Sequence, residues 1–148
     1  MLKMPLIKHI GNGMRIIMNI INRALTLNQN VANQTIECIA GCRVTLTLEE
    51  LAGLANPFNP GFTLSCVLLA GDPGPDPVIF TFPLVQNRVF RTPADITFPD
   101  HVFRATVGVG ILNEDTSGAD EIKARFTFVN NANGAAMTRR SPRITIVL

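Results

Sequence analysis

The sequence predicts an all-β protein whose body is a single antiparallel β-sandwich. From about residue 34 onward, apolar and polar residues alternate with a period of two, as in strands that bury one face. Turn-forming residues interrupt this alternation at short intervals, for example at 72–77 and 130–134. The chain has 148 residues, of which 47% are hydrophobic and 16% charged, which suits one domain with a substantial core.

An apolar and basic N-terminal arm, residues 1–23, is expected to precede the sandwich domain, residues 24–148. The first 36 residues hold four basic side chains and no acidic one, whereas the remainder holds 9 basic and 11 acidic residues. Four of the five methionines also lie in the first 25 residues. The β-branched residues between 14 and 21 favour a strand, although a helix with one polar stripe also fits this segment.

The alternation places the strands of the sandwich in order along the chain. Strands are predicted at 43–48, 62–68, 78–82, 85–91, 103–111, 122–128 and 144–148. One short helix is predicted from Leu48 to Ala55, because Thr47 to Glu50 have the spacing of a capping box and Pro57 ends the segment. The nine phenylalanines all lie between Phe58 and Phe128 and are expected to fill the core.

The spacing of these strands is typical of sandwiches of the immunoglobulin-like or jelly-roll type. The chain lacks the Cys…Trp…Cys pattern of immunoglobulin domains, so the spacing predicts an architecture and no family.

The cysteines are Cys38, Cys42 and Cys66, and their odd number argues against a complete disulfide framework. Two geometries remain open for the first pair. A tight turn at Ala40-Gly41 would bring the two thiols face to face, whereas a straight strand would point both toward one face. In either case we expect buried free thiols.

A loop rich in acidic side chains, residues 113–121, lies between two predicted strands. Its candidate Ca²⁺ ligands are Glu114, Asp115 and Asp120. The spacing differs from that of an EF-hand loop, and Lys123 or Arg125 can pair with the acids of a solvated hairpin loop. We therefore expect no bound cofactor, and a calcium-dependent binding or adhesion module is the alternative function.

The residues needed for catalysis are scarce. The chain has three serines, none within a G-x-S-x-G motif, and no glycine-rich phosphate loop before a helix. The two histidines are His9 in the arm and His101 at the start of a predicted strand. A couple of Cys66 with His101 is conceivable for nucleophilic chemistry, but we expect both residues to be structural. The sequence thus predicts that the protein is not an enzyme.

These features favour a structural, self-assembling subunit of a larger particle or filament, such as a virion component or an extracellular fibre. Its partners would be copies of itself and other structural subunits. Nucleic acid is not expected, because no aromatic residue accompanies the thinly spread basic residues of the arm. No segment is long and apolar enough to span a membrane, and no signal-peptide cleavage site follows the arm.

Contacts between subunits are expected in two places. One is the arm, where the apolar and basic residues of the 14–23 segment would meet a neighbour: Met14, Arg15, Ile17, Met18, Ile21 and Arg23. The other is a basic loop expected between two strands at residues 139–143, which begins with Arg139 and Arg140. Together with the acidic loop, this basic loop would permit head-to-tail contacts between copies.

Overall fold

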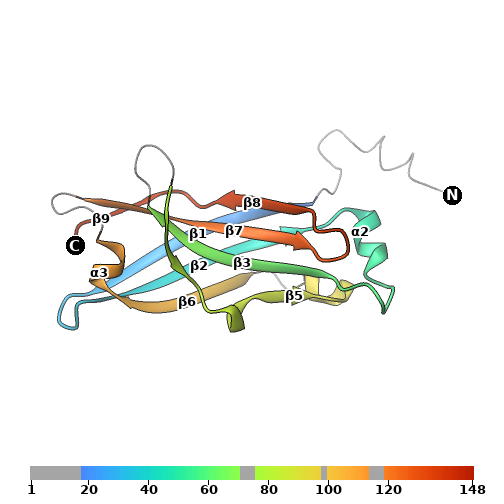
Figure 1. Cartoon of the computed structure of the whole chain (residues 1–148), viewed down its shortest axis with the longest axis horizontal. Coiled ribbons are helices and arrows are strands. Elements are labelled where there is room, and N and C mark those ends of the chain that lie inside the picture. The colour runs from blue at the N-terminus through green and yellow to red at the C-terminus, as the bar shows by residue number, and fades with distance from the viewer. Residues whose placement is uncertain (1–17, 71–75, 98–99, 114–118) are drawn as a thin grey trace.

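The computed structural model describes residues 18–70, 76–97, 100–113 and 119–148. These residues form two antiparallel sheets that pack face to face, with a short helix at one end of the sandwich (Figure 1). The predicted all-β fold, an antiparallel β-sandwich with few and short helices, is confirmed.

The first sheet has the strand order β1-β2-β6 in the described part of the chain. Its strands are β1 (Asn19–Asn30), β2 (Thr35–Thr45) and β6 (His101–Gly108). Along β2, every second side chain is buried, from Ile36 to Val44. Because β2 runs straight through Ala40 and Gly41, Cys38 and Cys42 lie on the same buried face, and the turn considered for this segment does not form.

The arm was expected to end at residue 23, and the structure places this boundary inside β1. Residues 19–21 already pair with β2, and Ile20 is 1% exposed within the core. Ile20 can be buried in this way only because the strand starts before residue 20. The charge and methionine content that set the arm apart from the sandwich domain do not indicate where the strand starts.

The second sheet is built around β3 (Phe62–Ala70) and β7 (Asp120–Asn130), which pair from Phe62 opposite Asn130 to Ala70 opposite Ile122. On the far side of each, two short strands take the place of one long strand. These are β4 (Val78–Thr81) and β5 (Arg88–Phe90) beside β3, and β8 (Ala136–Arg140) and β9 (Ile144–Ile146) beside β7. The break between β8 and β9 is tied to β7 by Ser141, whose Oγ accepts a hydrogen bond from Ala124 N at 2.9 Å.

The predicted helix is present as α2 (Leu48–Gly53), at one end of the sandwich. Its capping box is complete, because Thr47 Oγ1 accepts from Glu50 N at 3.0 Å and Glu50 Oε1 accepts from Thr47 N at 2.8 Å. These bonds satisfy backbone donors that the first helical turn leaves unpaired. The helix ends slightly earlier than predicted, with Leu54 as its C-cap.

Two predicted strands are wrong in part. The strand expected at 103–111 ends at Gly108, and the chain turns into α3 (Val109–Leu112), which buries Leu112 completely and leaves Ile111 48% exposed. The strand expected at 85–91 is divided into the 3₁₀ turn η1 (Leu84–Gln86) and the short β5. A second 3₁₀ turn, η2 (Pro93–Thr97), follows β5. From half-buried Val109 to buried Leu112 the inward-facing side chains are three residues apart instead of two, which the alternation up to Val107 did not indicate.

Six phenylalanines fill the space between the sheets and are at most 2% exposed: Phe62, Phe82, Phe90, Phe103, Phe126 and Phe128. The rings of Phe103 on β6 and Phe126 on β7 lie 6.3 Å apart and join the two sheets. Phe58 is 90% exposed, so the expectation that all phenylalanines enter the core is wrong. This residue follows Asn56 and Pro57 in a turn, where Phe58 N donates to Asn56 Oδ1.

Truncation of one core ring tests this assignment of the faces. Phe126→Ala is expected to lower the free energy of unfolding by about 3–5 kcal/mol, because it removes apolar contacts and leaves a cavity. Phe58→Ala, the same change at an exposed ring, should have little effect. Urea denaturation followed by far-UV circular dichroism measures both, and similar small losses for the two variants would show that the faces are assigned wrongly.

Candidate functional site

The edges of the two sheets are the first candidate surface, because an edge strand presents unpaired backbone groups to other chains. In the second sheet these edges are short. The outer strands β4, β5, β8 and β9 have only 4, 3, 5 and 3 residues. Pro83 separates the first two of these strands, and Pro142 separates the last two. Such short and interrupted edges offer little backbone for a partner to pair with.

The β6 edge of the first sheet is capped by a side chain at one residue, Arg104. Gln86 Nε2 donates to Arg104 O at 2.6 Å, and Gln86 Oε1 accepts from Arg104 N at 2.8 Å. One side-chain amide therefore makes both hydrogen bonds that a neighbouring strand would make at this residue. Residue spacing does not indicate this role of Gln86, because the apolar pair Leu84-Val85 makes the segment resemble a strand.

The β1 edge differs from the others in length. β1 has 12 residues and no strand on its outer side in the described part of the chain. A bulge between Ile21 and Ala24, with Asn22 at a φ of 53°, interrupts its first part. From Ala24 to Asn30 the register is continuous, and this stretch contains no charged residue and no proline. We call residues 24–30 the open edge.

Alternation along β2 determines which residues face outward at the open edge. Gln34 O accepts a hydrogen bond from Val109 N, so the backbone N–H and C=O of Gln34 point toward the β6 side. Because the direction alternates along a strand, every second residue of β2 after Gln34 also points these groups toward β6. The residues between them face β1, where Thr26 and Asn28 pair with Ile39 and Glu37. The intervening residues of β1 therefore turn their N–H and C=O groups outward: Leu25, Leu27 and Gln29. The same alternation turns Arg104 outward on β6, in agreement with its bonds to Gln86.

The structure describes three of the arm residues expected at subunit contacts. Ile21 and Arg23 are half-buried within β1, and Met18 packs against the core just before it. The other three lie outside the described residues: Met14, Arg15 and Ile17.

The basic pair Arg139 and Arg140 lies on β8 and not in the expected loop. Arg139 pairs with Phe126 of β7 and Arg140 with Arg125, and both arginines of the pair are exposed. Their long side chains reach water from a strand at the sheet edge, so the charges are compatible with a strand.

A carboxylate lies at the centre of this basic region. Asp76 Oδ2 accepts hydrogen bonds from Lys123 Nζ at 3.0 Å and from Arg140 Nη1. The bond from Lys123, assisted by the charge of Arg140, holds the pKa of Asp76 below its ordinary value. Among the described residues Lys123 pairs with Asp76, and its expected pairing with the acidic loop stays a prediction, because Glu114 and Asp115 lie outside these residues.

The acidic loop is described only at its two ends. Asp120 is 3% exposed at the start of β7, and Glu121 forms an ion pair with Arg143 at 3.4 Å. Glu114 and Asp115 lie outside the described residues. Within the described ranges no three side chains of the metal-ligating types gather into one group. The expectation that this loop binds no cofactor therefore stays a prediction, with calcium binding as its alternative.

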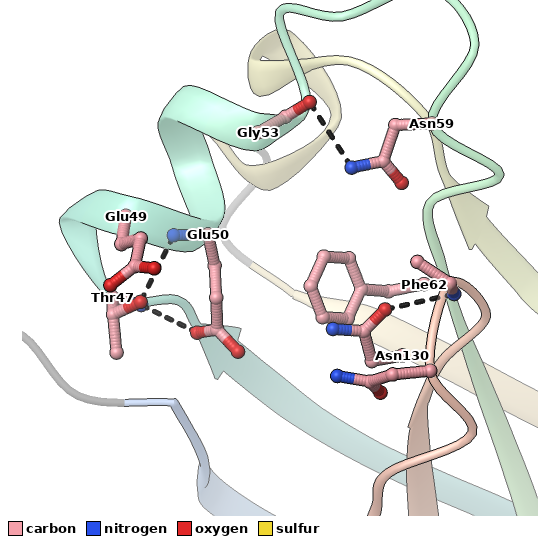
Figure 2. A pocket seen from close by; sticks show the side chains of 9 residues that line it. Thr47, Glu49, Glu50, Gly53, Asn59, Phe62 and Asn130 are labelled. Atoms are coloured by element: carbon pink, nitrogen blue, oxygen red, sulfur yellow. Dashed lines mark hydrogen bonds between the residues drawn. The ribbon is translucent and has the colours of Figure 1, made fainter.

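A polar pocket of about 420 Å³ opens between α2 and the turn after β7 (Figure 2). Most of its polar groups already support local structure. Glu50 belongs to the capping box, and Asn59 donates to Gly53 O at 3.1 Å while accepting from Gly61 N. Asn130 accepts from Ala132 N within the turn. The pocket therefore arises from capping and turn formation, and it gathers no reactive set of side chains.

The three thiols are buried and free. Burial raises the pKa of Cys38 to about 11 and that of Cys42 to about 12, and it also raises the pKa of Cys66. The thiols therefore remain protonated near neutral pH, where a thiol is a poor nucleophile. His101 lies directly opposite Cys42, while Cys66 pairs with Phe126 on the other sheet.

His101 is buried without a polar partner. It is 1% exposed, its ring meets Phe90 edge-on at 4.8 Å, and neither ring nitrogen has a hydrogen-bond partner among the described residues. Burial lowers the pKa of His101 below its ordinary value of 6.5; Arg88 lowers it further, and Asp100 opposes the shift. The imidazole is therefore neutral at pH 7 and acts as part of the core.

Comparison of the chain with models of protein families, with characterised proteins and with solved structures gives no significant match. Among the described residues, no helix has the length and apolar character needed to cross a membrane. The distinctive surfaces of this protein are the open edge and the charged face of β7 and β8.

Removal of the side chain that closes β6 tests its role. Gln86→Ala is expected to cost about 1 kcal/mol, because Arg104 loses two hydrogen bonds at a partly exposed site. It should also increase concentration-dependent association, measured by light scattering, because a second edge becomes available. Gln86→Glu retains an acceptor for Arg104 N and should have a smaller effect. Unchanged stability and association in the alanine variant would contradict the capping role.

The buried imidazole predicts a pH dependence of stability. In the unfolded chain His101 binds a proton near its ordinary pKa of 6.5, whereas the folded protein resists protonation of this ring. The unfolded state thus binds more protons as the pH falls below about 6.5, so stability is full above this value and is lost below it. Urea denaturation at pH 7.5 and 5.5 should show this loss in the wild type, and a smaller loss in His101→Phe. Equal losses in the two proteins would assign the effect to other groups.

Proposed function

We propose that the protein is a non-catalytic structural subunit that assembles with other copies through the open edge of β1, residues 24–30. The observation that carries the proposal is the contrast between edges. The other edges are short, interrupted by proline or capped at Arg104 by Gln86, whereas the open edge has an uninterrupted register without charge. Addition of an extended segment to such an edge is an established mode of protein recognition.

The segment before β1, residues 1–17, is the proposed donor from a neighbouring copy. It contains three basic residues and no acidic one, whereas the chain from Glu37 onward has more acidic than basic residues. This difference in charge favours contact between the segment of one copy and the body of another. A contact of this head-to-tail kind does not use the same surface twice, so it builds rings or filaments.

One substitution tests the role of the open edge in assembly without disturbing the fold. Gln29 is exposed and turns its N–H outward, so Gln29→Pro should remove an outward donor and obstruct an added strand. We expect the variant to keep the wild-type melting temperature and to lose assembly, measured by multi-angle light scattering and negative-stain electron microscopy.

The neighbouring residue provides a matched control. Asn28 turns its N–H toward β2, where Glu37 lies opposite, so Asn28→Pro should disturb the β1–β2 ladder and lower the melting temperature. If Gln29→Pro assembles like the wild type while remaining folded, the open edge is not the contact. If the wild type remains a monomer at high concentration, the proposed function itself is wrong.

A further inference from the structure

The outer face of β7 and β8 contains a pair of arginines in an unusual position. Arg125 on β7 lies directly opposite Arg140 on β8 in the antiparallel ladder. Side chains at directly opposed positions point to the same face, with their β-carbons only about 5 Å apart. Like charges in such a pair repel each other, so this position needs compensation by negative charge.

The described residues supply only part of that compensation. Asp76 is the one carboxylate bonded to this group, and it is shared by Lys123 and Arg140. The nearby Glu121 is paired with Arg143. Arg125 forms no ion pair in the described part of the chain, so three cations face one carboxylate.

Arg125 also has an unsatisfied donor. Its Nε is buried and has no hydrogen-bond partner among the described residues, while the residue as a whole is half-buried. A buried donor without an acceptor is unfavourable. An acceptor at the outer nitrogens of this guanidinium would gain a charge-assisted hydrogen bond and reduce the repulsion from Arg140.

The surrounding side chains add further donors. Thr127 and Thr138 form the next cross-strand pair on the same face, two residues from the arginine pair along each strand. On the other side, Lys123 follows at the same spacing along β7. Two planar guanidinium groups flanked by hydroxyls and an ammonium match a ligand with several oxygens, because arginine binds such groups through two parallel hydrogen bonds.

We propose that the face around Arg125 and Arg140 is a binding site for an oxyanion such as phosphate or sulfate. The site is distinct from the open edge and does not depend on the proposed function. It explains why the facing arginines occur together, since a bound oxyanion converts their repulsion into two favourable contacts.

The test uses the full chain and inorganic phosphate or sulfate at constant ionic strength. Isothermal titration calorimetry and the melting temperature should show saturable binding to the wild type. Arg125→Gln should weaken binding about tenfold or more, because a charge-assisted bond is lost. Arg104→Gln, the same change at an exposed arginine of the other sheet, should leave binding unchanged.

A second measurement guards against simple misfolding of the variant. Without added oxyanion, Arg125→Gln should be at least as stable as the wild type in urea, because the substitution removes the repulsion from Arg140. The proposal is wrong if the wild type shows no saturable binding, or if Arg125→Gln and Arg104→Gln bind the oxyanion equally well.

Discussion

Aromatic packing between the two sheets is the interaction on which the rest of the structure depends. No strand in the described residues belongs to both sheets, so side chains hold the sheets together. On β6, Phe103 meets Phe126 of β7, and His101 meets Phe90 of β5. These contacts fix which face of each strand turns inward. Once the inward face is fixed, the direction of every outward side chain follows, including the arginines of β7 and β8.

The second constraint is that an open sandwich has edges. The edges of this protein differ. In the second sheet they consist of short strands interrupted by prolines, and in the first sheet the amide of Gln86 caps Arg104 of β6. The bulge at Asn22 gives β1 a further irregularity near its start, since a bulge twists a strand away from regular pairing. Only the later part of β1 is left regular, and this restriction to one stretch is the reason to connect it with assembly.

The sequence predicted most of what depends on local periodicity. The strands at 62–68 and 122–128 and the capping box at Thr47 follow from residue spacing alone, and the structure contains all three. Features that depend on distant contacts could not be predicted in this way. Gln86 acquires its role only because Arg104, 18 residues later, lies beside it.

The candidate site was predictable only in part. The sequence identified the basic pair at 139–140 but not its strand, since charged residues are expected in loops more often than opposite a core strand. Their cross-strand partners Phe126 and Arg125 belong to a separate segment, so the facing arginines emerge only from the register. The start of the open edge likewise depends on the bulge between Ile21 and Ala24, which the spacing of residues does not indicate.

The three buried thiols can be used to measure local opening of the sandwich. The chain has no tryptophan and no tyrosine, so the usual optical signals of folding are missing. Cys38 and Cys42 lie on β2 of one sheet and Cys66 on β3 of the other, each at most 2% exposed. A thiol reagent reaches these sulfurs only when the surrounding strands separate. The rates of modification at the three positions therefore report separately how often each layer of the sandwich opens.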